Sequence, residues 1–296
     1  MPVSTLRGYV LPGWVGPLDL VIAVSCSGQT EETISVAAEA AKRGARLVGV
    51  GSAGSALHDL VASTPGSVFI PVDAGALMPR ASLWLLATPL LLIAHALGLA
   101  DVPRAALERA ADVLDETSVE CGPVSPLVDN RGKLLGVSLA ASLPMVWGTS
   151  PLGAVAANRL ACQLNENAKL PVVVGTLPEA NHNQVVALDG PFAATNEDDI
   201  FRDPLEDGAA PARLRLVLLR DSDEHAQDAR RADASEILAE ERDVPVDVLR
   251  AVDGHPVVRL ASLIGVADWA SVYAAIALGI DPSPIGPIVE LKARIS

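Results

Sequence analysis

Short apolar runs alternate with helical patterns along the first part of the chain. Residues 19–25 (DLVIAVS) form a continuous apolar run, which is typical of a strand buried on both faces of a sheet. Residues 30–43 are rich in Ala and Glu, as in a helix. The alternation predicts further strands at 46–51 and 67–72 and further helices at 56–62, 80–97 and 104–114. Strands that alternate with helices predict a parallel sheet with right-handed crossovers.

The second half repeats this pattern after a stretch of turn-forming residues, 120–133, where we place the domain boundary. It predicts strands at 144–149, 171–175, 213–219 and 244–252, and helices at 152–169, 179–186, 226–241, 257–278 and 287–295. Residues 195–212 are acidic, contain Pro and Gly, and are predicted to form a loop. We therefore expect an α/β protein with two lobes, residues 1–119 and 134–296, each an open parallel sheet flanked by helices.

One predicted helix has a composition like that of a membrane span. Residues 83–100 are nearly all apolar and about long enough to cross a bilayer. They include Pro89 and His95, however, and lie between segments with the α/β pattern. We therefore predict a helix buried in the protein core.

The composition limits the size, the partners and the compartment. With 296 residues, 50% of them hydrophobic and 20% charged, the chain has ample material for two folded domains. The net charge of −14 would repel nucleic acid and anionic membranes, whereas a local pocket of backbone N–H groups could still bind a small anion. The three cysteines are widely spaced and the first residues lack an apolar signal core. These features favour a cytoplasmic protein without a disulfide framework or a zinc site.

The segment 24–33 carries the strongest motif, because it joins a predicted strand to a predicted helix. Ligands of open α/β sheets bind beyond the carboxyl ends of the strands, and a helix N-terminus offers unpaired N–H groups. The hydroxyls of Ser25, Ser27 and Thr30 would add an uncharged cradle for a phosphate, and Gly28 would let the backbone approach it closely. The alternative is a helix cap made by Ser27 or Thr30. The residues alone favour neither interpretation.

Two further segments could supply acid–base groups in the second lobe. Glu166 lies between two asparagines at the end of a helix whose upstream part is apolar. Burial there would raise its pKa toward that of a useful general base, although a solvated helix end is the commoner case. His182 is also flanked by asparagines and could exchange a proton near neutral pH, although a histidine in a loop is more often merely exposed.

Two basic residues complete the candidate set. Arg80 follows Pro79 at the start of the apolar helix, where a fixed guanidinium could stabilise an enediolate or a phosphate; it could equally be a surface residue. Lys292 lies on the last predicted helix, where a solvated lysine is the default. The chain contains no dinucleotide-binding or Walker loop, no His-Glu-x-x-His metal motif and no Gly-x-Ser-x-Gly elbow.

Together these segments resemble one family, the sugar isomerase (SIS) domain proteins. Residues 25–33, Ser-Cys-Ser-Gly-Gln-Thr-Glu-Glu-Thr, resemble the phosphate-binding Ser-x-Ser-Gly-x-Thr-x-Glu-Thr signature of SIS domains. Residues 165–169, Asn-Glu-Asn-Ala-Lys, and 178–183, Pro-Glu-Ala-Asn-His-Asn, are similar to the C-terminal lobe of bifunctional phosphoglucose/phosphomannose isomerases. The Pro79–Arg80 junction and the tail from Asp281 to Lys292 fit the same pattern. The likeness spans nearly the whole chain.

The resemblance implies an aldose–ketose isomerase of hexose 6-phosphates. Ser25, Ser27 and Thr30 would hold the phosphate of the sugar, and Glu166 would move a proton between C1 and C2 through a cis-enediol. The resemblance implies neither a metal nor a cofactor, and it leaves open which hexose phosphate is preferred.

The remaining roles that the resemblance implies concern ring opening and charge. His182 would help to open the sugar ring, and in relatives this histidine reaches in from the partner subunit, which implies a homodimer. Arg80 would stabilise the enediolate, and Lys292 would assist ring opening or bind substrate oxygens.

The chain departs from the family pattern in two places. Relatives carry a strand, a Gly-Gly-Ser turn and a helix before the region where this chain begins, and here only residues 2–8 stand in that place. Ile285 occupies a position where relatives that act on both sugars place a hydroxyl residue, which weighs against mannose 6-phosphate. The first departure motivates a second hypothesis, a protein that senses a sugar phosphate without turning it over.

Overall fold

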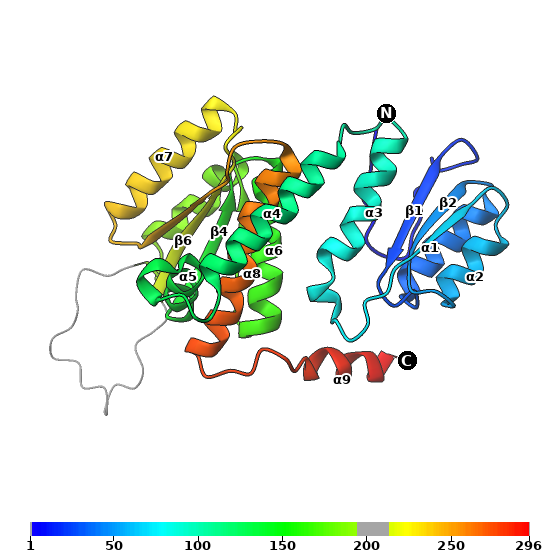
Figure 1. The fold of residues 1–296 in the computed structure, drawn as a ribbon. Helices are drawn as coiled ribbons and strands as arrows, with labels where there is room; N and C mark the ends of the chain where they lie inside the picture. Colours follow the sequence, from blue (N-terminus) through cyan, green and yellow to red (C-terminus); the bar gives the residue numbers. More distant parts are fainter. Residues whose placement is uncertain (1, 194–212, 296) are drawn as a thin grey trace. The chain divides into compact units, whose positions relative to one another are not determined.

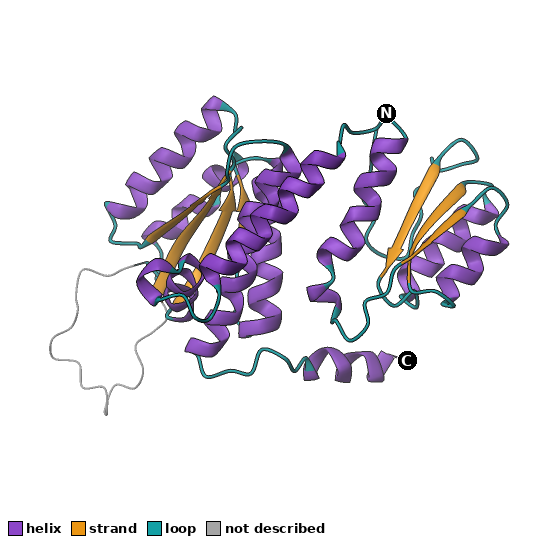
Figure 2. Cartoon of the chain, viewed as in Figure 1, coloured by secondary structure: helices purple, strands orange, loops and turns teal. Residues whose placement is uncertain are grey.

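The structure, a computed structural model, describes residues 2–193 and 213–295. The predicted loop at 195–212 therefore lies outside the described residues. The chain divides into two compact units, Met1–Pro103 and Arg104–Ser296. Each unit is built on a parallel sheet flanked by helices, which confirms the predicted α/β class (Figures 1 and 2).

The first unit contains a three-stranded parallel sheet in the order β1-β2-β3. Its strands are β1 (Leu20–Ser25), β2 (Arg46–Gly51) and β3 (Val68–Pro71), close to the predicted runs. Both crossovers run in the same direction along the sheet, so their right-handedness places α1 (Glu31–Lys42) and α2 (Ala56–Ser63) on the same face (Figure 1). Small residues of α1 and Leu57 and Val61 of α2 pack there against β1 and β2.

The other face of this sheet is covered less completely. The 3₁₀ turn Pro79–Ala81 leads into α3 (Leu83–Ala96), and no residue of α3 is buried, so the prediction of a buried core helix is wrong. Leu20 and Ile22 of β1 are 40% and 36% exposed, so the prediction of a strand buried on both faces is also wrong. An apolar sequence favours burial, but the neighbours that a segment acquires decide how much surface is covered.

The second unit contains a four-stranded parallel sheet in the order β5-β4-β6-β7. Its strands are β4 (Ser142–Gly148), β5 (Val173–Thr176), β6 (Arg213–Arg220) and β7 (Val246–Arg250). The chain passes from β4 to β5 in one direction and then back past β4 to β6 in the other. Because parallel crossovers are right-handed, connections that run in opposite directions lie on opposite faces of the sheet.

The helices of the second unit follow this rule (Figure 1). One face carries α6 (Pro151–Gln163) and the long α8 (Pro256–Ala277), against which α4 (Arg104–Cys121) and α5 (Arg131–Ala140) also pack. The other face carries α7 (Ala226–Glu240) and the 3₁₀ turns Glu179–His182 and Gln184–Asp189. The short helix α9 (Gly286–Ile295) ends the unit.

Helices α4 and α5 differ from the sequence-based prediction. Helix α4 extends to Cys121, and α5 was not predicted because the turn-forming residues before it masked its start. Asn130 caps α5, with its Oδ1 accepting a hydrogen bond of 2.8 Å from the backbone N–H of Lys133. The predicted lobes, 1–119 and 134–296, differ from the two compact units at α4, which packs against α8 of the second unit.

Helix α8 is the one described helix that is long and apolar enough to cross a membrane, judged by length and composition. Of its most apolar window, 61% is buried inside the protein. This burial is typical of the central helix of a folded domain. The apolar residues of α8 therefore mostly pack inside the second unit.

Candidate functional site

The loop between β1 and α1, residues 25–30, holds the three predicted hydroxyl residues and is called the hydroxyl loop below. Gly28 is buried and has a φ of +64°, a backbone conformation that residues with a Cβ atom rarely adopt. A Cβ atom at this position would lie 2.0 Å from Ser55 Oγ. The tight approach of the next loop therefore requires glycine at position 28.

The hydroxyl groups do not cap α1 in the usual way. Ser25 is buried and its Oγ shares a hydrogen bond of 2.7 Å with Thr30 Oγ1. Thr30 occupies the N-cap position but makes no side-chain capping hydrogen bond. The exposed Ser27 accepts a hydrogen bond of 3.2 Å from the N–H of Gln29, which precedes the helix. The geometry thus leaves the first N–H groups of α1 to an acceptor other than Thr30, as an anion site requires.

A second serine-bearing loop, residues 52–55 between β2 and α2, lies against the hydroxyl loop. The Ser52 hydroxyl donates a hydrogen bond of 2.7 Å to the carbonyl of Cys26, and the N–H of Leu57 donates one of 3.0 Å to the carbonyl of Gly28. Ser55 caps α2 by accepting a hydrogen bond from the N–H of His58. The sequence interpretation missed this loop, although Gly-Ser-Ala-Gly-Ser between a strand and a helix repeats the signal of the hydroxyl loop.

The charges around the hydroxyl loop are mostly negative. The carboxylates of Glu31 and Glu32, in the first turn of α1, raise the pKa of the exposed Tyr9 phenol. An anion at this loop must therefore be held by hydroxyl and N–H dipoles or by a cation from elsewhere. Arg80 belongs to the same unit, on the connection that leaves the carboxyl end of β3, and is partly buried. Since β1 and β3 are both parallel to β2, that connection and the hydroxyl loop both start at the carboxyl ends of the strands.

Glu166 lies on a widened helical turn. Helix α6 ends at Gln163 and continues as the π-helical turn Leu164–Ala168, called the Glu166 turn below. The predicted single helix at 152–169 thus changes its hydrogen-bonding pattern before Glu166, which is itself partly buried. Such π-helical turns are frequent at functional sites, because they redirect side chains that a regular helix would place elsewhere.

Two polar contacts fix α6 and the Glu166 turn to α8. Arg159 forms a two-pronged ion pair with Asp268, with Nε–Oδ1 and Nη2–Oδ2 distances of 2.9 and 3.0 Å. Burial raises the pKa of the Asp268 carboxyl, and the hydrogen bond from Arg159 opposes this effect. Asn167 donates a hydrogen bond of 2.9 Å from its Nδ2 to Ser271 Oγ. The backbone that carries Glu166 therefore has a defined place against α8.

His182 ends the 3₁₀ turn Glu179–His182 and is exposed. Its neighbour Asn181 donates a hydrogen bond of 2.8 Å to Ser235 Oγ of α7. This turn belongs to the face covered by α7, whereas the Glu166 turn extends α6 on the opposite face. The turns that carry Glu166 and His182 therefore pack on opposite faces of the same sheet.

The predicted site residues fall into two sets. Ser25, Ser27, Thr30 and Arg80 belong to the first unit, and the three hydroxyl residues come together in one loop. Glu166, His182 and Lys292 belong to the second unit, where Lys292 lies exposed on α9. Among the residues that the structure describes, no three His, Cys, Asp or Glu side chains form a group able to hold a metal ion. The catalytic roles of these residues stay predictions.

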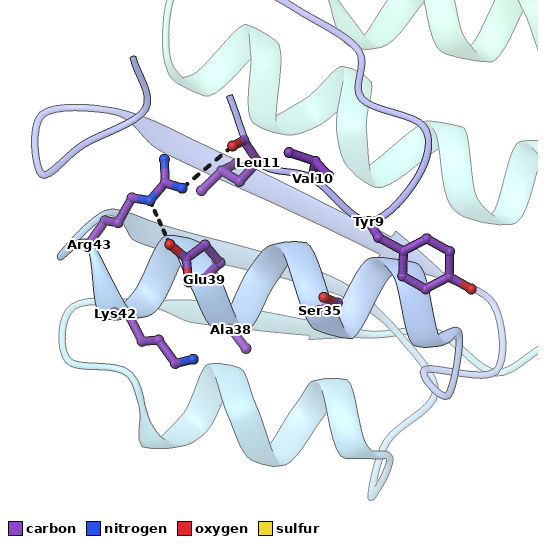
Figure 3. A pocket seen from close by; sticks show the side chains of 8 residues that line it. All are labelled: Tyr9, Val10, Leu11, Ser35, Ala38, Glu39, Lys42 and Arg43. Carbon is purple, nitrogen blue, oxygen red and sulfur yellow. Dashed lines mark hydrogen bonds and ion pairs between the residues drawn. The ribbon is translucent and has the colours of Figure 1, made fainter. Parts of the chain in front are cut away.

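A shallow pocket of about 380 Å³ lies on the outer face of α1, away from the candidate residues (Figure 3). It lies between α1 and the segment that carries Tyr9, Val10 and Leu11. Arg43, which lines the pocket, pairs with Glu39 at 2.8 Å and donates a hydrogen bond of 2.8 Å to the carbonyl of Pro12. These contacts hold the N-terminal segment against α1, so the pocket results from the packing of that segment.

Comparison with known proteins identifies the family. Residues 128–295 match the model of the bacterial phosphoglucose isomerase C-terminal SIS domain. The chain is 30% identical over 296 residues to a bifunctional phosphoglucose/phosphomannose isomerase of Caldicellulosiruptor bescii, covering all of this chain and 82% of that protein. It is 28% identical to the protein of the same name from Aquifex aeolicus, covering 99% of this chain and 81% of that protein.

A solved structure shares the fold at lower sequence identity. The glucose-6-phosphate isomerase-like protein of Thermus thermophilus superposes with a TM-score of 0.55 and 16% identity, covering 96% of this chain and 89% of that one. The family match covers more than half of the chain, and the first relative aligns along its whole length. The chain therefore belongs to the SIS-domain family of bifunctional phosphoglucose/phosphomannose isomerases.

Proposed function

We propose that the chain interconverts the aldose and ketose forms of hexose 6-phosphates, with fructose 6-phosphate as the ketose and glucose 6-phosphate or mannose 6-phosphate as the aldose. The observation that carries the proposal is the hydroxyl loop, in which Ser25 and Thr30 bond to each other rather than to the N-terminus of α1. Relatives aligned along the whole chain are named for this activity, which supports the proposal.

The proposed reaction moves one proton from C2 to C1 and a second proton from O2 to O1. From the aldose, the Glu166 carboxylate accepts the proton on C2, the electrons of that C–H bond form the C1–C2 double bond, and the electrons of the C1=O double bond move to O1, which gives a cis-enediolate. The proton on O2 then passes to O1, the electrons left on O2 form the C2=O double bond, and the carboxyl of Glu166 returns its proton to C1, which gives the ketose. The Arg80 guanidinium balances the negative charge of the enediolate, and the side chains of His182 and Lys292 assist opening of the sugar ring.

We further propose that the protein works as a homodimer in which His182 serves the site of the partner. The turns that carry Glu166 and His182 pack on opposite faces of one sheet, which supports a site that takes His182 from a second copy. In a dimer with two-fold symmetry, each copy contributes the same residue to the site of the other copy. The second unit also leaves large apolar side chains exposed on one stretch of chain, as a partner surface requires: Val119, Val124, Leu127, Val128, Leu134 and Val137.

The shared site predicts complementation between two inactive variants. We expect Glu166→Gln and His182→Ala chains, coexpressed with different tags and purified as mixed dimers, to show about half of the parental turnover, because one of the two sites is intact. The reverse control pairs the parent with a chain that carries both substitutions, which leaves no intact site. A monomer in light scattering at micromolar concentration, or an inactive mixed dimer, would contradict the proposal.

The isomerase proposal is tested by turnover of the purified chain. We expect fructose 6-phosphate to be converted to an aldose 6-phosphate, with glucose 6-phosphate and mannose 6-phosphate resolved by NMR. The competing hypothesis is a sensor, which binds the sugar phosphate with micromolar to millimolar affinity and converts none of it. Binding without conversion would support that alternative and overturn the isomerase.

A further inference from the structure

Lys169, the last residue of the Asn-Glu-Asn-Ala-Lys segment, has an unusual backbone conformation. Its φ of 59° and ψ of 24° place it in the left-handed region directly after the Glu166 turn. Glycine is the residue favoured at such a helix end, since it adopts this conformation without strain. A lysine held there indicates that its side chain contributes something glycine would not.

The ammonium group of Lys169 binds the end of the Glu166 turn. Its Nζ lies 2.6 Å from the carbonyl oxygen of Glu166 and 3.4 Å from that of Asn167. A cation close to the carbonyl groups that end a helical turn offsets the negative end of the helix dipole. Lys169 therefore fixes the backbone of the residue proposed as the base.

The same ammonium group binds a second segment, which follows α8 and leads into α9. Nζ lies 2.9 Å from the carbonyl oxygen of Pro284 and 3.5 Å from that of Pro282. This segment has its own turn, in which the Asp281 carboxylate accepts a hydrogen bond of 2.8 Å from the N–H of Ser283. One ammonium group thus connects the turn that carries Glu166 to the segment that leads to Lys292.

We propose that Lys169 is a positioning residue, whose ammonium group holds the Glu166 turn against the segment at 282–284 and so fixes the carboxylate of Glu166 for proton transfer. This role rests on the isomerase function proposed above. A proton acceptor must be held within a fraction of an ångström, and a displacement of 1 Å can cost about 10²-fold in rate. The contacts of Lys169 with the carbonyl of Glu166 and of Asn167 with Ser271 of α8 hold the backbone at Glu166 as this demand requires.

The test variant is Lys169→Gly, because glycine suits the left-handed backbone and removes only the side chain. We expect kcat with fructose 6-phosphate to fall roughly 10–10²-fold, with KM unchanged within about twofold and no loss of thermal stability. Amide hydrogen exchange should become faster in the Glu166 turn and at residues 281–285. Added n-butylammonium should restore part of the lost kcat by returning an ammonium group to the same carbonyl oxygens.

Arg230→Ala is the matched control. Arg230 lies exposed on α7, in the same unit as Lys169 but on the other face of the sheet, so its replacement removes one positive charge equally. We expect this variant to keep the parental kcat. A Lys169→Gly chain that keeps the parental kcat, or that loses kcat only together with thermal stability, would overturn the proposal.

The outcomes separate this inference from the proposed function. If the parent chain binds but does not convert fructose 6-phosphate, the isomerase proposal fails, and the positioning role fails with it. Amide exchange in the same experiment then still shows whether Lys169 ties the two segments together. If the parent converts the sugar and the glycine variant does so equally fast, only the role of Lys169 is refuted.

Discussion

A Glu166→Gln variant is expected to bind fructose 6-phosphate as the parent does and to convert it roughly 10²–10⁴-fold more slowly. Glutamine keeps the shape of the side chain and removes the carboxylate that accepts the C2 proton. The hydroxyl loop belongs to the first unit, so binding of the phosphate should not depend on this change. Incorporation of solvent deuterium into the product measures proton transfer directly, and calorimetric titration measures binding.

Glu240→Gln serves as the control for this prediction. Glu240 is an exposed carboxylate on the last turn of α7, so its replacement changes the net charge equally without touching the proposed site. If the Glu166→Gln chain exchanges the C2 proton as fast as the parent, another group is the base. If both variants slow exchange to the same extent, the effect comes from net charge.

The second large effect is expected at the hydroxyl loop. Ser27→Asp would place a carboxylate where the sugar phosphate is proposed to bind. Two like unit charges about 4 Å apart repel by about 4 kcal/mol at an effective dielectric constant of about 20, so the affinity should fall about a thousandfold. Titration with fructose 6-phosphate measures the change in affinity. Raising the salt concentration should reduce the repulsion only partly, because close charges are poorly screened.

Ser35→Asp provides the matched control for this second variant. Ser35 lies exposed on α1, beyond its first turn, so the same new charge is added away from the hydroxyl loop. We expect its affinity for fructose 6-phosphate to stay within about threefold of that of the parent, since an exposed charge is screened by solvent and salt. Unchanged affinity in the Ser27→Asp chain would mean that the loop is not the phosphate site.

Most elements of the fold were predictable because their signal is local. The apolar run that became β2 and the Ala- and Glu-rich segment that became α1 were placed within one residue of their observed bounds. Alternation of strands and helices was enough to predict two parallel sheets, since a parallel pair requires a crossover. The hydroxyl loop was predictable for the same reason, because Ser-x-Ser-Gly-x-Thr falls between a strand and a helix.

Other features could not be predicted because neighbours far along the chain determine them. The sequence of α3 is as apolar as that of a core helix, yet none of its residues is buried. The widening of the helix at Glu166 accompanies contacts of Asn167 with α8 and of Lys169 with the segment after α8. No pattern within residues 152–169 encodes those contacts.

The sequence by itself determined the family, the alternating α/β order and the residues that carry candidate chemistry, since each of these depends on residue types and their spacing. Only the tertiary structure decided how Glu166 and His182 are placed. The two residues are 16 positions apart in the sequence. Because the chain leaves β4 toward β5 and returns past it to β6, right-handed crossovers place α6 and the turn that carries His182 on opposite faces of the sheet.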